Sequence, residues 1–222
     1  MIARHQFMAY LKEEYAEEHP LQSILASDRA AVAEQIRKKH GMTVALYRYQ
    51  HMIFLYYEGL HRELVPQTLF PALTACLESV PVKGGHEQWL PMHTVYYNAV
   101  PKSVDSWQRV GKKERIGRIA YLIPDKLVSY LYYHKELLEE GLFEGERYLS
   151  IGLYDTILFT YSESPRVITH LRLESAEEST VITRWRQVDP KSHFDHSFSG
   201  SGNFLDLEEL LSLGWEEVFD EP

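Results

Sequence analysis

Two residues in the second half of the chain, Tyr130 and His134, are four apart in the sequence. On a helix this spacing places both side chains on one face, one turn from each other. Histidine titrates near neutral pH, so His134 could both give and take a proton, and the phenol of Tyr130 could donate a hydrogen bond or act as an acid. Tyr148 begins the next predicted strand, which a split βαβ arrangement places under this helix. We therefore expect the three side chains to converge on one cleft; the alternative is that Tyr130 and His134 only pack an amphipathic helix edge on the sheet.

The first half of the chain contains a matching pair, Tyr15 and His19, at an offset of 115 residues from Tyr130 and His134. The position equivalent to Tyr148 is a threonine, Thr43. We therefore expect at most one working site, in the second half.

The predicted hairpins of the two halves also match, at an offset of 105 residues. Tyr56 corresponds to Tyr161, and Glu58 to Glu163. Two matches in the same order indicate an internal duplication. The two glutamates end their hairpins, where they could form structural salt bridges or reach the cleft.

The elements that must position these residues follow one order in both halves. Residues 6–11 favour a strand, Ser27-Asp28 is typical of a helix N-cap, and residues 42–60 form two β-rich runs around Gln50-His51. A helix between residues 66 and 79 and a strand at 93–97 complete a β-α-β-β-α-β order, the split ferredoxin-like arrangement.

The same order restarts after a polar segment, residues 101–113, that lacks periodicity and is predicted to be a linker. A strand is expected at 118–123, a helix from Pro124, a hairpin at 148–163 and a helix around 175–188. Residues 205–211 are expected to form a helical turn and residues 215–219 the last strand. This divides the chain into a first repeat, residues 1–104, and a second, residues 105–222.

Composition excludes several classes of protein. The 222 residues carry a formal net charge of −9, and no dense run of lysine and arginine is present, so nucleic-acid binding is not expected. A single cysteine fits a reducing compartment, and no apolar run is long enough for a membrane helix. We expect a soluble cytoplasmic protein, either a monomer with an internal pseudo-dimer or a homodimer.

A metal site is not expected. His193, Asp195 and His196 offer three possible ligands, but no fourth ligand at a suitable spacing is evident, and a polar loop explains them better.

The stretch from Gly117 to Glu163 contains Pro-x-Lys-x-x-x-Tyr-x-x-x-His followed by Tyr-x-x-Ile-x-Leu and Leu-Phe-x-Tyr-x-Glu. This pattern resembles the L-rhamnose mutarotase family, whose members are small ferredoxin-like chains that pair into a dimeric α/β barrel and interconvert sugar anomers. The resemblance implies that Tyr130, His134 and Tyr148 line the pocket. It also places Trp185 near a family tryptophan that packs against the sugar.

The resemblance implies an α+β fold in which two ferredoxin-like repeats pack as a dimeric α/β barrel within one chain. Its implied function is a mutarotase that needs no cofactor and acts on a monosaccharide. His134 would be the acid and base, assisted by Tyr130 and Tyr148, while Trp185 and Glu163 would bind substrate. Two alternatives stay open: a cofactor-free monooxygenase-like enzyme, which the same scaffold also hosts, and a non-catalytic ligand-binding protein.

Overall fold

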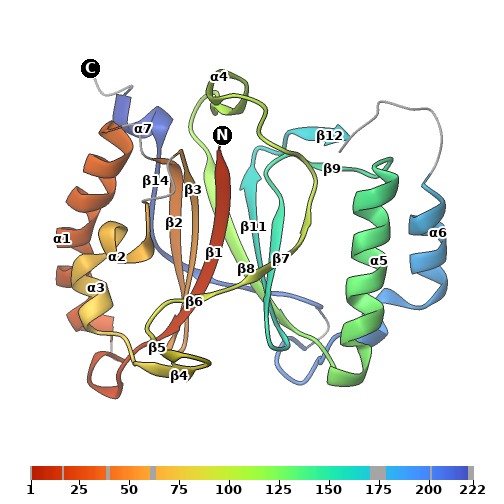
Figure 1. The fold of residues 1–222 in the computed structure, drawn as a ribbon, viewed down its shortest axis with the longest axis horizontal. Coiled ribbons are helices and arrows are strands. Elements are labelled where there is room, and N and C mark those ends of the chain that lie inside the picture. Colours follow the sequence, from red (N-terminus) through yellow and green to blue (C-terminus); the bar gives the residue numbers. More distant parts are fainter. Residues whose placement is uncertain are drawn as a thin grey trace. The chain divides into compact units, whose positions relative to one another are not determined.

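The structure is a computed structural model that describes residues 2–16, 18–38, 41–60, 64–170, 179–200 and 202–219, without the side chains of residues 18–20 (Figure 1). It is a mixed α+β protein whose main sheets are antiparallel. The chain divides into two compact units. Unit 1 comprises residues 1–92, 101–112 and 208–222, and unit 2 comprises residues 93–100 and 113–207.

Unit 1 contains a five-stranded sheet in the order β14-β2-β3-β1-β6. Its strands are β1 (Ala3–Tyr10), β2 (Gly41–Tyr49), β3 (Met52–Gly59), β6 (Leu90–Pro91) and β14 (Glu208–Gly214), with a separate hairpin of β4 (Val80–Val82) and β5 (Gly85–Glu87). Its helical segments are η1 (Glu13–Tyr15), α1 (Glu18–Arg37), α2 (Pro66–Leu69), α3 (Pro71–Ala75), α4 (Val104–Trp107) and α7 (Trp215–Phe219).

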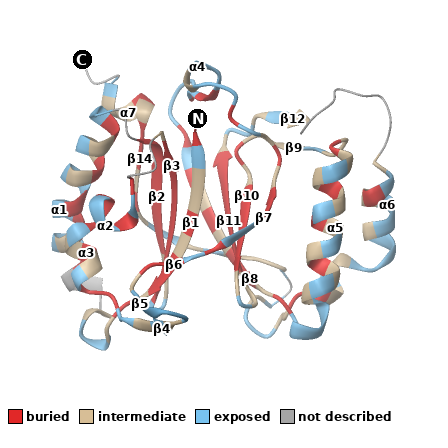
Figure 2. Cartoon of the chain, in the orientation of Figure 1, coloured by how far each residue is buried: buried red, intermediate tan, exposed pale blue. Residues whose placement is uncertain are grey.

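Helices α1, α2, α3 and α7 cover one face of this sheet and enclose the core of unit 1 (Figure 1). The core is built from alternate residues of the strands, such as Val44 and Leu46 on β2 and Ile53 and Leu55 on β3. Strand β3 is buried along its whole length, as Figure 2 shows.

Helix α3 begins at Pro71, whose fixed backbone suits a first helical turn. The first N–H groups of a helix have no partner within the helix. In α3, the backbone N–H groups of Ala72 (2.9 Å) and Leu73 (2.8 Å) donate to the carboxylate of Asp28, which lies on α1. Asp28 lies inside α1 rather than at a helix start, so the predicted N-cap at Ser27-Asp28 is wrong.

Unit 2 contains a second five-stranded sheet, in the order β13-β8-β11-β10-β7. Its strands are β7 (His93–Tyr97), β8 (Glu114–Tyr121), β10 (Ser150–Tyr154), β11 (Ile157–Ser164) and β13 (Leu205–Asp206), with a separate pair of β9 (Glu144–Glu146) and β12 (Ile168–His170). Its helical segments are η2 (Pro124–Lys126), α5 (Leu127–Glu140), α6 (Thr180–Gln187) and η3 (Pro190–His193). Helix α6 packs on α5, which itself contacts β7 (Figure 1).

The two sheets share one strand order. In unit 1, β6 lies beside β1, β1 beside β3, and β3 beside β2. In unit 2, β13 lies beside β8, β8 beside β11, and β11 beside β10. The fifth position is filled by a strand from the other half of the sequence, β14 in unit 1 and β7 in unit 2. Both of these strands contain a bulge at equivalent residues, Leu210 in β14 and Val95 in β7.

Three expectations need correction. The described strands form two five-stranded sheets and two small pairs, not a closed barrel. The last two elements were predicted as a helical turn followed by a strand, but the structure has a strand followed by a helix. Residues 208–214 form strand β14, and Trp215–Phe219 forms helix α7. The predicted linker contains α4 and several buried residues, Trp107 and Arg109 among them.

Candidate functional site

Helix α5 presents Tyr130 and His134 on its buried face, together with Leu137. The i, i+4 spacing stacks the two rings, whose centroids are 3.9 Å apart at an interplanar angle of 27°. The helix ends at Gly141, whose positive φ of 72° suits a glycine cap.

Other aromatic rings of unit 2 surround His134. Trp185 of α6 meets the imidazole edge to face at 5.6 Å, and Tyr96 of β7 meets it in the same way at 5.7 Å. Trp185 also contacts Tyr130, at 6.0 Å. The structure therefore brings together three of the predicted site residues, Tyr130, His134 and Trp185, and adds Tyr96. We call these four residues the aromatic cluster.

The tautomer of His134 follows from its contacts. Its Nδ1 lies 2.8 Å from the carbonyl oxygen of Tyr130 and must carry the proton, because a carbonyl can only accept. Burial lowers the pKa of His134 to about 4, although the hydrogen bond to Tyr130 opposes this shift. His134 is therefore neutral at pH 7, with a lone pair on Nε2.

Two polar tips of the cluster, His134 Nε2 and the Tyr130 hydroxyl, have no hydrogen-bond partner among the described residues. Burial raises the pKa of Tyr130 well above its ordinary value, so this phenol stays protonated and can donate. The cluster therefore offers one acceptor and one donor between aromatic rings.

The contacts described for the two remaining predicted residues of the second half are with other neighbours in unit 2. Tyr148 is buried in the turn before β10, where the Arg147 guanidinium lies 5.9 Å from its ring centroid. Glu163 is buried on β11 and accepts a hydrogen bond of 2.6 Å from Tyr161.

The counterparts in the first half are described only in part. Tyr15 lies in η1 and packs against the core of unit 1. The side chain of His19 lies outside the described residues. Thr43, at the position equivalent to Tyr148, is fully buried on β2, and its hydroxyl has no hydrogen-bond partner among the described residues.

The region of His193, Asp195 and His196 is a loop with internal contacts. His196 contacts two backbone carbonyls, and Asp195 accepts from the backbone of Ser197. Across the described part of the chain, no group of three histidine, cysteine or acidic side chains is placed to hold a metal ion.

His193 is nevertheless part of the surroundings of the aromatic cluster, which the sequence reasoning missed. It is buried, lies 2.9 Å from the Ser129 hydroxyl through Nε2, and its ring centroid is 4.6 Å from that of Trp185. Tyr96 was also missed, and its hydroxyl donates to Asn98 at 2.8 Å. The sequence places Tyr96 in the predicted strand at 93–97 and His193 among possible metal ligands, and neither pattern indicates a position beside helix α5.

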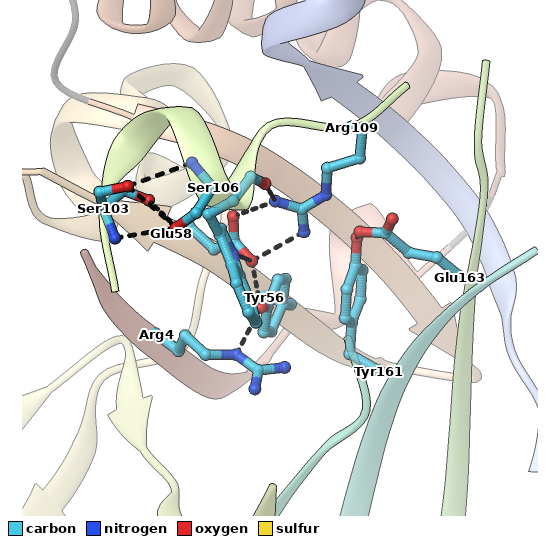
Figure 3. Close-up of polar contacts among 9 residues, drawn as sticks. Arg4, Tyr56, Glu58, Ser103, Ser106, Arg109, Tyr161 and Glu163 are labelled. Atoms are coloured by element: carbon cyan, nitrogen blue, oxygen red, sulfur yellow. Dashed lines mark hydrogen bonds and ion pairs between the residues drawn. The ribbon is translucent and has the colours of Figure 1, made fainter. Parts of the chain in front are cut away.

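A second polar cluster lies in unit 1, around Glu58 on β3 (Figure 3). Its carboxylate is fully buried and accepts from Tyr56 (2.7 Å), from the Trp107 indole (2.9 Å) and from both terminal nitrogens of Arg109 (2.6 and 2.8 Å). Burial would raise the pKa of Glu58, but Arg109, Arg4 and Trp107 outweigh it and hold that pKa below its ordinary value. The matching Tyr-x-Glu at the end of each hairpin was the sequence signal, but it did not reveal the partners in residues 101–112.

Both oxygens of the Glu58 carboxylate are bound by the protein itself. Oε1 accepts from Tyr56, Trp107 and Arg109, and Oε2 accepts from the other terminal nitrogen of Arg109. We therefore regard the Glu58 cluster as the contact that holds residues 107–109 on the sheet of unit 1, and the aromatic cluster as the candidate site.

Comparisons with known proteins find no matching family model and no matching curated protein. Among solved structures, the chain is similar to a "putative monooxygenase" from Fusobacterium nucleatum, with a TM-score of 0.45 and 10% identity over 96% of this chain and 94% of that one. It is also similar to an anthrone oxidase-like protein, with a TM-score of 0.33 and 11% identity over 98% and 94% of the two chains.

One of these structures is named a putative monooxygenase and the other an anthrone oxidase-like protein, and neither is named a rhamnose mutarotase. The predicted membership of the mutarotase family is therefore wrong, as are the isomerase activity and the role in carbohydrate metabolism that it implied. Within the described residues, the helices are too short or too polar to span a lipid bilayer.

Proposed function

We propose that the chain is a monooxygenase-like enzyme that oxidises a planar hydroxyaromatic compound at the aromatic cluster, without a bound cofactor. The observation that carries this proposal is the neutral His134, whose Nδ1 is held by the Tyr130 carbonyl, which leaves Nε2 as the acceptor, and whose ring contacts Tyr96, Tyr130 and Trp185. This supports the monooxygenase-like alternative over sugar binding, because the walls are flat rings and the polar groups are few.

The substrate class follows from the chemistry that one buried base can support. His134 would take a proton from an activated C–H or O–H group of the substrate, leaving a resonance-stabilised anion. The anion would lie beside the new imidazolium, and opposite charges in a site of low dielectric stabilise each other. The Tyr130 hydroxyl would donate a hydrogen bond to the substrate oxygen that carries the negative charge.

Such an anion can reduce molecular oxygen directly. For a substrate with an activated methylene group, one O₂ is consumed; one oxygen atom becomes the new carbonyl and the other leaves in water. The methylene carbon loses the four electrons that O₂ gains, so the reaction balances without another reductant.

The test is oxygen uptake with anthrone as the probe, corrected for the uncatalysed reaction. We expect one O₂ consumed per anthrone and ¹⁸O from ¹⁸O₂ in the new carbonyl. Because a general base contributes about 10²–10⁴-fold, His134→Gln should lower kcat/KM by about 100-fold or more. The matched control is His93→Gln, which changes an exposed histidine on β7 of the same unit. Oxygen uptake unaffected by His134→Gln would overturn the proposal, and binding of anthrone without uptake would favour a non-catalytic ligand-binding protein.

We also infer that the two halves of the chain are ferredoxin-like repeats that arose by duplication, with the boundary near residues 104 and 105. The shared strand order and the equivalent bulges at Val95 and Leu210 support this interpretation. The single cysteine supports a reducing, cytoplasmic location.

A further inference from the structure

Unit 1 contains a cavity of about 340 Å³ between helix α1 and the edge of its sheet. Its walls come from α1 and β14, which lie side by side (Figure 1), and from Arg48 on β2. Binding pockets for small molecules usually measure about 300–1,000 Å³, so this volume suits a small ligand.

The floor of the cavity is apolar. Leu21 and Leu25 of α1 and Leu211 of β14 line it, and all three belong to the buried core of unit 1. Because these side chains are packed in the core, the floor is preformed and fits an aliphatic group.

The rim carries charges of both signs. Arg29 and Arg48 contribute two cations, and Glu208 and Glu209 contribute two carboxylates. Among the described residues, no ion pair joins either arginine to either glutamate, even though Glu208 is the backbone partner of Arg48 in the sheet.

Arg48 is held in place by the backbone rather than by a carboxylate. Its Nε donates to the carbonyl of Gln50 at 2.7 Å, and its Nη2 donates to the carbonyl of Ala16. A guanidinium oriented by carbonyls retains its charge and N–H groups for an incoming carboxylate, whose geometry it matches.

We propose that this cavity is a second site, which binds a free amino acid with an aliphatic side chain. The ligand carboxylate would contact Arg29 and Arg48, its ammonium group would contact Glu208 or Glu209, and its side chain would lie on the leucine floor. A ligand with one charge would leave the opposite pair on the rim unmatched, whereas a zwitterion matches both. The site is independent of the oxidation proposed for unit 2.

The experiment is isothermal titration calorimetry of the full chain with L-leucine, 4-methylpentanoate and 3-methylbutylamine. The second compound lacks the ammonium group and the third lacks the carboxylate. We expect saturable binding of L-leucine, with an affinity about tenfold or more above that of either analogue, because each analogue loses charge-assisted hydrogen bonds.

Variants locate the site. Arg29→Gln and Glu208→Gln change exposed rim residues and should each weaken leucine binding about tenfold. Ala26→Phe should abolish it, because Ala26 is an exposed residue of α1 that lines the cavity. Ala30→Phe, at an exposed position of the same helix outside the lining, is the matched control and should bind normally.

Three outcomes would overturn the proposal: no binding of L-leucine up to about 10 mM, equal affinity for an analogue, or equal loss in Ala26→Phe and Ala30→Phe. Circular dichroism of each variant confirms that a loss of binding is not a loss of fold.

Discussion

At the scale of single residues, the charge state of His134 is set by its position in the fold. A free histidine has a pKa of about 6.5. In the folded protein, burial against Tyr96, Tyr130 and Trp185 lowers the pKa to about 4, and the neutral form is the one that can accept a substrate proton. The same shift links the stability of the fold to pH.

The direction of this link can be predicted. Because the folded pKa of His134 lies below the unfolded one, its contribution to stability is complete above about pH 6.5 and is lost as the pH falls toward 4. The full loss is roughly 3 kcal/mol. Urea unfolding of the wild type and of His134→Phe at pH 7, 5.5 and 4 measures it. The difference in unfolding free energy between the two proteins should shift in favour of the variant as the pH falls; a constant difference would show that His134 titrates as a free histidine does.

Glu58 illustrates the opposite arrangement, because its buried carboxylate stays ionised through its hydrogen bonds and its ion pair with Arg109. Arg109→Met would leave the carboxylate buried without its main counter-ion, which costs about 3–5 kcal/mol. Its depressed pKa adds a pH dependence, because the stability that the pair contributes is present above the unfolded pKa and is lost as the pH falls.

Thermal and urea unfolding test this prediction. The double variant Glu58→Gln with Arg109→Met should recover part of the loss, since no unpaired charge remains. A double variant as unstable as Arg109→Met alone would mean that packing, not charge, governs the cluster.

At the scale of elements, short helix α3 depends on a residue 44 positions away in the sequence. Asp28→Ala would leave the N–H groups of Ala72 and Leu73 without their acceptor and should lower the unfolding free energy by about 1–3 kcal/mol. Ser27→Ala, at the adjacent exposed position of α1, is the control and should change stability little. Equal effects of the two substitutions on urea unfolding would contradict the capping role.

Asp28 also shows which part of the fold a local sequence pattern cannot predict. The hairpin of β2 and β3 and the strand β7 were predictable, because runs rich in β-branched and aromatic residues beside short polar breaks indicate strands. Asp28 looked like a helix start because a local pattern cannot reveal that its acceptor oxygens serve another helix. Pairing along β2 makes residues 208–214 a strand, although Leu207, Leu210 and Leu211 have helical spacing.

The candidate site was predictable to a similar extent. Tyr130 and His134 follow from i, i+4 spacing on one helix, which is a local property. Tyr96, His193 and Arg109 come from other segments, and only tertiary structure brings them to their partners. Arg109 in particular lies in a polar stretch without periodicity, which the sequence indicates only as a linker.

At the scale of the whole molecule, each sheet is completed by a strand from the other half of the sequence. A fragment of residues 1–104 would lack β14, and its β7 would lack the partner strand β10. We expect this fragment and the fragment 105–222 to be largely unfolded when expressed separately, and to recover native-like dispersion in ¹H–¹⁵N NMR spectra when mixed. Well-dispersed spectra from either fragment alone would show that the exchanged strands are dispensable.

The exchanged strands also bear on how the protein is made. A ribosome makes β1, α1, β2 and β3 well before β14, which pairs with β2. The sheet of unit 1 therefore cannot complete this edge when β2 is made, and the N–H and C=O groups along β2 stay exposed to other nascent chains until β14 follows. The early strands of unit 1 are thus the part of this sheet that is exposed to aggregation for the longest time during synthesis.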